Sequence, residues 1–238
     1  MIRSFLKETI KSLFFRSSIE KTRAALKEKW VLLKMYKDKI QNYQGDCAVI
    51  LGKHRKFSDY IREFAETIPE GSKGLDIGAG PKGCNSVFFT HCQLDGCDAE
   101  PEVVTSLDET NNYKNKFQYF FGREDPLPYT DNSLDFVVCS CMIQHLNSFT
   151  ELERGITEVS RVLRGNVEGR FYLMFKAGTN DTDLVHTNRY YNQERRFRVF
   201  MPEDVSALCQ AHNMVILRKE FLLDDNYIPY CLLVLTKK

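Results

Sequence analysis

The sequence lacks the features that mark several broad classes of protein. Its eight cysteines include no Cys-x-x-Cys pair, so neither a zinc knuckle nor a disulfide framework is indicated. No apolar run approaches the roughly 20 residues that a membrane-spanning helix needs. Internal repeats and low-complexity stretches are also missing. These absences favour a globular protein with free thiols in a reducing compartment, and we expect a cytoplasmic location.

The sequence also lacks a recognisable set of metal ligands. His91, Cys92 and Cys97 lie close together, but their spacing matches no known zinc motif. Cysteines within apolar runs, such as Cys139 and Cys231, behave as small hydrophobic residues. We therefore expect no metal site.

A large net charge is absent, but the charge is unevenly distributed. Residues 1–40 contain eleven lysines and arginines against four acidic residues, so this segment carries +7 and the remaining chain −6, for a net +1. A nucleic-acid-binding domain usually has a basic face on its folded body. The distribution therefore argues against a uniformly basic nucleic-acid surface.

The first 69 residues have the pattern of a helical segment. Apolar residues recur at helical spacing over 2–40, and a second helix is expected at about 54–68. We expect residues 1–69 to form a helical arm or lid. The basic, serine-containing start is also typical of a mitochondrial presequence or a membrane-surface helix. The missing cleavage site favours the structural role, and a mitochondrial location stays an alternative.

From residue 73 onward, strand-like and helical segments alternate. Strands are expected at 73–77, 93–98, 117–121, 134–140 and 169–175, and helices at 83–90, 101–110, 150–164 and 202–212. Such alternation predicts βαβ units and a mostly parallel sheet. Segments 214–222 and 227–236 predict a terminal hairpin, which adds an antiparallel edge. The expected fold class is α/β and Rossmann-like.

A glycine-rich turn at residues 74–83 carries the strongest local signal. Glycine allows the chain to turn sharply after a strand and to approach a ligand closely. The backbone amides of the following helix then face that ligand. Twenty residues after Gly78, Asp98 ends the second strand, where a carboxylate can accept both ribose hydroxyls. The turn and the carboxylate together predict a nucleoside site.

The same glycines also satisfy the dinucleotide fingerprint, because Gly78, Gly80 and Gly83 have the G-x-G-x-x-G spacing. Asp76 argues against a dinucleotide, since a carboxylate gains nothing beside a pyrophosphate. A cofactor with a sulfonium and an ammonium group, and without phosphates, tolerates an acid there. The terminal hairpin would supply a seventh, reversed strand, and this feature also argues against a dinucleotide.

Five segments, in order, resemble the motifs of class I S-adenosylmethionine-dependent methyltransferases. They are 75–80, 96–102, 127–138, 143–146 and 158–164. The subgroup they resemble most is the broad one that holds ubiquinone-biosynthesis and many small-molecule methyltransferases. The resemblance implies that residues 70–238 form a seven-stranded, mostly parallel, Rossmann-like domain with a reversed C-terminal strand. It also implies S-adenosylmethionine as the cofactor.

The resemblance implies a role for each matching residue at the cofactor site. The methionine end would be lined by Asp76, Gly78, Ala79 and Gly80. The ribose would be held by Asp98 with Ala99, and the sulfonium would lie over Cys139 and Ser140.

One position departs from the family pattern. Arg123 follows Gly122 where the family usually has an aspartate that accepts a hydrogen bond from the adenine amine. Arginine cannot accept a hydrogen bond. Glu124 or Asp125, after a one-residue shift, or a neighbouring backbone group would then have to serve.

His145 is the candidate general base. Methyl transfer from a sulfonium is a direct displacement, so alignment of the nucleophile carries much of the catalysis. A base is needed only if the acceptor must lose a proton early. A hydrogen-bonded structural histidine is the alternative role for this side chain.

The segment from 176 to 200 is expected to be a long polar loop at the ligand-binding edge. An anionic or aromatic acceptor would be clamped by Tyr190, Tyr191, Arg195, Arg196 and Arg198. A surface loop with salt-bridged arginines is the alternative.

Three functions remain open at this point. The first is a small-molecule methyltransferase, and the second is a tRNA or other RNA methyltransferase whose basic arm contacts phosphates. The third is a catalytically inactive partner protein, for which Arg123 is the sequence hint. The acidic body argues against the second, and the sequence leaves the acceptor and the oligomeric state open.

Overall fold

The computed structural model describes residues 57–238, except for 108–111, 124, 179–182, 189–192 and 224–228. These residues belong to a compact unit that extends from 48 to 238. The helical segment expected at 2–40 lies outside the described residues. Within the described part, no helix is long and apolar enough to cross a bilayer.

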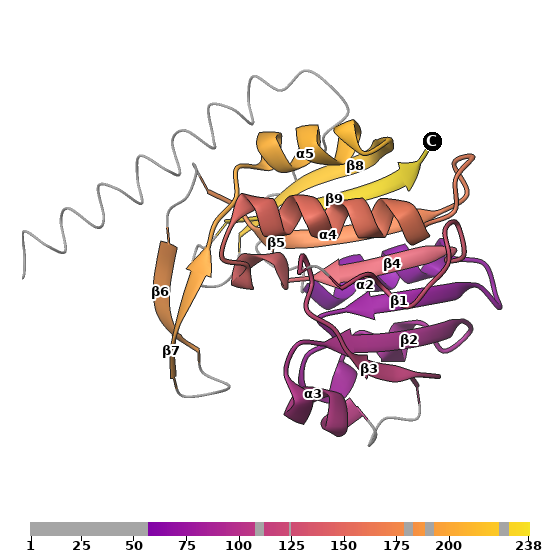
Figure 1. The fold of residues 1–238 in the computed structure, drawn as a ribbon, viewed down its shortest axis with the longest axis horizontal. Coiled ribbons are helices and arrows are strands. Elements are labelled where there is room, and N and C mark those ends of the chain that lie inside the picture. Colours follow the sequence, from indigo (N-terminus) through magenta and orange to yellow (C-terminus); the bar gives the residue numbers. More distant parts are fainter. Residues whose placement is uncertain (1–56, 108–111, 124, 179–182, 189–192, 224–228) are drawn as a thin grey trace, which may run out of the picture. The chain divides into compact units, whose positions relative to one another are not determined.

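Seven strands form the central sheet (Figure 1). They are β1 (Lys73–Ile77), β2 (Gln93–Asp98), β3 (Lys116–Gln118), β4 (Phe136–Ser140), β5 (Arg170–Lys176), β8 (Met214–Leu223) and β9 (Pro229–Lys237). Their order across the sheet is β3-β2-β1-β4-β5-β9-β8. Strands β1 to β5 pair in parallel, and β9 runs antiparallel to both β5 and β8. The predicted Rossmann-like sheet with a reversed C-terminal strand is confirmed.

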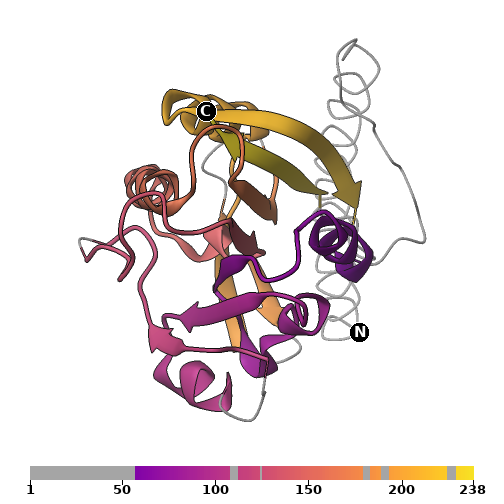
Figure 2. The ribbon, with the colours of Figure 1, turned by 90° about the vertical axis from the view of Figure 1, so that its right-hand side faces the viewer.

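Helices cover both faces of this sheet. Helix α2 (Phe57–Glu66) lies on one face and α4 (Phe149–Val162) on the other (Figure 2). Helix α5 (Pro202–Ala211) contacts α4 and β8, and α3 (Pro101–Ser106) contacts β2 and β3. Because both faces are covered, β4 is buried along Phe136, Val137, Val138 and Cys139 instead of alternating between core and solvent.

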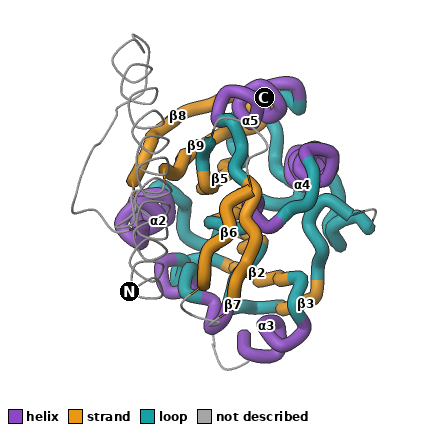
Figure 3. The backbone as a smooth tube through the Cα atoms, turned by 90° about the vertical axis from the view of Figure 1, so that its left-hand side faces the viewer, coloured by secondary structure: helices purple, strands orange, loops and turns teal. Residues whose placement is uncertain are grey.

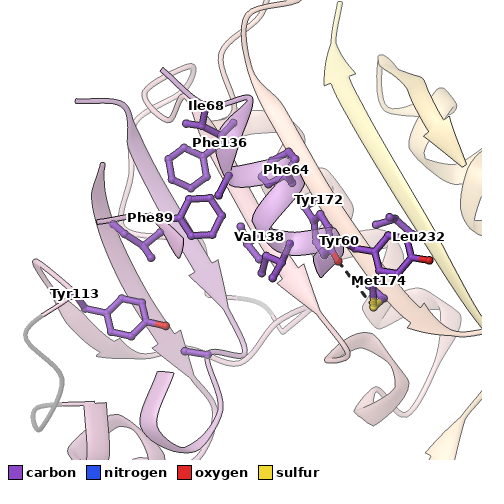
Figure 4. Packing of buried hydrophobic residues seen from close by; sticks show 14 of the residues in the cluster. Tyr60, Phe64, Ile68, Phe89, Tyr113, Phe136, Val138, Tyr172, Met174 and Leu232 are labelled. Carbon is purple, nitrogen blue, oxygen red and sulfur yellow. Dashed lines mark hydrogen bonds between the residues drawn. The ribbon is translucent and has the colours of Figure 1, made fainter. Parts of the chain in front are cut away.

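Aromatic packing joins α2 to the sheet (Figure 4). Phe64 lies 5.3 Å from Tyr172 of β5 and 6.3 Å from Phe89, and Phe89 stacks on Phe136 of β4 at 5.0 Å between ring centroids. Such pairs add about 0.5–1.5 kcal/mol each beyond the burial of their area. The segment from residue 57, which the sequence assigned to the N-terminal arm, is therefore part of the core of the sheet domain.

Two expected elements differ from the structure near the start of the domain. The prediction of an α-helix at 83–90 is wrong, because the chain forms two 3-10 turns there, η1 (Pro81–Gly83) and η2 (Ser86–Phe88). Gly83 has a φ of +53°, which no α-helix continues through. The third strand is also shorter than the expected 117–121, since it ends at Gln118.

The prediction of a long polar loop at 176–200 is also wrong, because the segment contains regular secondary structure. It contains an antiparallel hairpin of β6 (Asp183–Asn188) and β7 (Gln193–Arg198). These strands are mostly polar, so they lack the apolar alternation that signals a strand. The hairpin lies beyond the carboxyl ends of the parallel strands (Figures 1 and 3). It therefore stands at the edge where open α/β sheets bind their ligands.

Candidate functional site

A pocket of about 670 Å³ opens at the carboxyl ends of the parallel strands. The strand order reverses here, because β2 lies on one side of β1 and β4 on the other. Ligands of open α/β sheets bind at such a switch point. Its walls include residues 77–81, 98–100, 119–121 and 140–142, together with side chains from η4 (Ile143–His145), β5, β7 and β9.

The glycine turn forms the wall above β1. Gly78 has a φ of +71°, and a Cβ atom added there would lie 2.3 Å from Cγ of Met142. Any residue with a side chain at position 78 would therefore collide with Met142, so glycine allows the turn and the segment after β4 to approach this closely. The amides of Gly78 and Ala79 donate to the Cys97 carbonyl at 2.9 and 3.0 Å, which ties the turn to β2.

Asp98 meets this turn across the pocket. Its Oδ2 atom accepts a hydrogen bond from the Gly80 amide at 3.1 Å, and its Oδ1 atom accepts one from the Glu100 amide at 3.1 Å. A carboxylate has about four acceptor sites, so each oxygen can accept a further bond. Asp98 and its neighbour Ala99 line the pocket. The turn and the carboxylate that the sequence paired thus share one crevice, which fits a bound ribose.

Asp76 lies beneath the turn and is not on the pocket wall. Its fully buried carboxylate accepts hydrogen bonds from the Tyr113 hydroxyl at 2.7 Å and from Nδ2 of Asn85 at 3.1 Å. Burial raises the pKa of Asp76 to about 6, although these hydrogen bonds oppose the shift. Asn85, which does line the pocket, is held in place by this carboxylate.

The end of β4 forms the opposite wall. Cys139, expected beneath the sulfonium, is fully buried within the sheet, and burial raises the pKa of its thiol well above the usual range. Ser140, Cys141 and Met142 line the pocket in its place. Cys141 has a φ of +58°, a conformation uncommon for residues other than glycine and enriched at functional sites. This turn presents the segment after β4 to the glycine turn.

Aromatic and basic side chains form the wall after β3. The guanidinium carbon of Arg123 lies 3.9 Å from the ring centroid of Phe120, and both residues line the pocket. The pair offers a flat surface with a positive charge but, at Arg123, no hydrogen-bond acceptor. Of the two alternative acceptors, Glu124 lies outside the described residues, and Asp125 is absent from the described lining of the pocket.

The far end of the pocket contains residues that the sequence did not single out. Lys176 ends β5, Gln144 lies in η4, Phe197 in β7 and Tyr230 in β9, and all four line the pocket. No local pattern in the sequence predicts these four residues as pocket residues, because their elements converge only in the folded chain. His145, which the sequence did single out, also lines this end, with its ring 5.0 Å from that of Phe197.

Of the expected acceptor clamp, the structure describes the side chain of Arg198 alone. Tyr190 and Tyr191 lie outside the described residues, as do the side chains of Arg195 and Arg196. Arg198 is absent from the described lining of the pocket, whereas its neighbour Phe197 belongs to it. Successive side chains of a strand point to opposite sides, so the two residues face in opposite directions.

The cysteines and histidine that were considered as metal ligands have other surroundings. Nε2 of His91 lies 3.1 Å from the Ile68 carbonyl oxygen, and Cys97 is buried in β2. Within the described part of the chain, no group of three or more His, Cys, Asp or Glu residues is arranged to hold a metal ion.

Comparisons with known proteins agree with this geometry. A family model described as a methyltransferase domain matches residues 75–172, from β1 to β5. YcgJ of Bacillus subtilis, described as an uncharacterized methyltransferase, is 30% identical over 126 residues. This match covers 51% of the chain and 47% of YcgJ, so it spans about half of that relative's length.

Solved structures share the fold. An S-adenosylmethionine-dependent methyltransferase from Methanosarcina mazei has a TM-score of 0.60 at 17% identity, over 74% of this chain and 96% of the other. The crystal structure of Bacillus subtilis YcgJ has a TM-score of 0.58 at 18% identity, over 76% and 97% of the two chains. The family model identifies residues 75–172 as a methyltransferase domain, and the solved structures show that the chain has the fold of S-adenosylmethionine-dependent methyltransferases.

Proposed function

We propose that this protein transfers a methyl group from S-adenosylmethionine to a small-molecule acceptor. The observation that carries the proposal is the single pocket in which Asp98, the glycine turn and the segment after β4 face one another. A pocket of about 670 Å³ with aromatic walls suits a cofactor together with a compact acceptor.

The lining suits this cofactor at each of its parts. Asp98 would accept hydrogen bonds from the ribose hydroxyls, and Phe120 with Arg123 would offer a flat face to the adenine. The glycine turn, tied to β2 by its amides, would leave room for the methionine part. When bound, S-adenosylmethionine supplies a methyl group on a sulfonium, which is already activated for displacement.

The residues of the chain would then act mainly by positioning the reacting groups, and less by acid or base chemistry. The rigid turn at Gly78 and the turn at Cys141 fix the two walls between which the reacting groups must align. Alignment of this kind lowers the barrier of a two-reactant step. His145, at the far end of the pocket, would take a proton from acceptors that must lose one early.

The charge of the pocket favours a small molecule over RNA. Among the described lining residues, Lys176 and Arg123 are the lysine and the arginine, and three acidic residues line the same pocket. An RNA backbone usually needs several cations along one face. A steep salt dependence of tRNA binding to the full chain would instead favour the RNA alternative.

Calorimetry with S-adenosylhomocysteine tests the proposal. We expect the full chain to bind it, and Asp98→Asn to weaken binding at least tenfold because the ribose loses charge-assisted hydrogen bonds, worth about 1.5–3 kcal/mol. Asp95→Asn is the matched control, since Asp95 lies on the same strand but bonds Asn115 and Tyr129 away from the pocket. Absence of binding in the wild-type chain would support the inactive-partner alternative.

A further inference from the structure

A buried lysine stands at the end of β5, in the wall of the pocket. Lys176 is 3% exposed. Its Nζ atom lies 4.4 Å from the ring centroid of Phe197 and 5.5 Å from that of Tyr230. The three residues come from β5, β7 and β9, so the fold brings a cation and two aromatic rings together from distant parts of the chain.

The register of the sheet separates this lysine from the glycine turn. Met174 pairs with Ser140 at the end of β4, and Lys176 follows two residues later, beyond that level. Strand β4 stands between β5 and β1, which carries the glycine turn. The lysine therefore belongs to the end of the pocket opposite Asp98, next to the segment after β4.

A second buried polar residue lies beside the lysine. Gln144 is 3% exposed, and its Oε1 atom accepts a hydrogen bond from the Lys176 backbone amide at 3.4 Å. With its carbonyl oxygen used in this way, the side-chain amide group remains a donor of two hydrogen bonds. An ammonium and an amide donor on one wall suit an anionic oxygen group.

The ammonium group and the two rings lie together in the wall of the pocket. A ligand at this wall would meet the positive charge of Lys176 beside two flat apolar surfaces, which suits an anionic group attached to an aromatic body. Among the described residues at this end of the pocket, Lys176 supplies the lysine charge, and a single ammonium group suits a monoanion better than a phosphate dianion.

We propose that Lys176, Gln144, Phe197 and Tyr230 form a subsite for a carboxylate on the methyl acceptor, whose flat apolar body contacts the two rings. This inference rests on the proposed function and names the substrate class of the same pocket. Lys176 is a binding residue here, and it orients the acceptor toward the segment after β4.

Binding of benzoate and benzamide tests the subsite, because the two probes share shape and differ in charge. Both are titrated by ligand-observed NMR into the full chain saturated with S-adenosylhomocysteine. We expect benzoate to bind at least fivefold more tightly than benzamide. Lys176→Gln should abolish that preference, and Lys176→Arg should retain most of it.

Lys219→Gln is the matched control. Lys219 is also buried, at 4% exposed, and its Nζ atom lies 5.7 Å from the ring centroid of Phe221, but it bonds Ser206 outside the pocket. This variant should keep the preference for benzoate, and melting curves identify any variant that fails to fold. Equal binding of the two probes to the wild-type chain would overturn the subsite, as would an undiminished preference in folded Lys176→Gln.

Two further outcomes separate this inference from the function on which it rests. If Lys176→Gln weakens S-adenosylhomocysteine at least tenfold and leaves the benzoate preference intact, the lysine holds the cofactor and the subsite is overturned. If phenyl phosphate binds more tightly than benzoate, the monoanion assignment is wrong. Absence of S-adenosylhomocysteine binding in the wild-type chain overturns the proposed function itself, whichever probe is preferred.

Discussion

At the scale of single residues, carboxylates in the same domain serve different purposes because their surroundings differ. Asp98 is partly exposed in the pocket and accepts backbone hydrogen bonds, so it stays available to a ligand. Asp76 is fully buried beneath the glycine turn and bonds Tyr113 and Asn85. The sequence predicted a pocket position for both residues, but only burial, which depends on tertiary contacts, distinguishes them.

The buried carboxylate predicts a dependence of stability on pH. Burial raises the pKa of Asp76 from 3.8 to about 6 in the folded chain. Between about pH 4 and 6 the unfolded chain therefore releases a proton that the folded chain retains, so this group lowers the free energy of unfolding as the pH rises. By pH 7 the loss amounts to about 3 kcal/mol.

Asp76→Asn removes the titrating group and keeps an acceptor for Tyr113. Relative to the wild-type chain, we expect the variant to gain about 2–3 kcal/mol of stability as the pH rises from 4 to 7. Urea unfolding at pH 4, 5, 6 and 7 measures the difference. Parallel stability curves for the two proteins would contradict the assignment of a raised pKa.

At the scale of elements, α2 is a structural part of the sheet domain. It buries Tyr60, Ile61, Phe64 and Ala65 against the sheet. The helical period predicted this helix from the sequence, but not the surface against which its apolar stripe packs. That surface includes Phe136 of β4 and Tyr172 of β5, which lie more than 70 positions after Phe64 in the chain.

Truncation of Phe64 measures this packing. We expect Phe64→Ala to lower the free energy of unfolding by about 3–5 kcal/mol, because the ring leaves a cavity among Phe89, Phe136 and Tyr172. Val87→Ala is the control, since Val87 is 55% exposed and should change stability by less than about 0.5 kcal/mol. A loss below about 1 kcal/mol at Phe64 would mean that α2 is only loosely attached.

The β6–β7 hairpin shows how an element can be missed. Its polar strands resemble a loop in sequence, yet Phe197 contacts both Lys176 and His145. Among the side chains of the hairpin that the structure describes, Phe197 contributes to the wall of the pocket, whereas the sequence predicted this role for the neighbouring arginines.

At the scale of the whole molecule, the place where the domain begins can be tested by truncation. The sequence predicted a boundary near 69, and α2, which precedes that position, packs in the core of the sheet domain. We expect residues 48–238 to unfold cooperatively and to bind S-adenosylhomocysteine. Residues 70–238, which lack α2, should not fold, since burial of each large apolar side chain contributes about 1.5–3 kcal/mol to a total of only about 5–15 kcal/mol.

Circular dichroism melting curves and calorimetry on both fragments provide the measurement. Cofactor binding by residues 70–238 would show that α2 is dispensable. The role of an arm or lid for the segment before α2 stays a prediction, and a loss of acceptor binding in residues 48–238 with intact cofactor binding would support it.

The sequence alone determined the parallel strands of the sheet, the terminal hairpin, the glycine turn and the position of Asp98 at the end of the second strand, because these depend on local periodicity, on backbone conformation and on residues near strand ends. Only the tertiary structure decided that Asp76 and Cys139 lie behind the pocket wall and that Lys176, Phe197 and Tyr230 meet at its far end. The reason is physical: whether a side chain faces a ligand depends on burial and register among strands that are distant in sequence, and no local pattern encodes that contact.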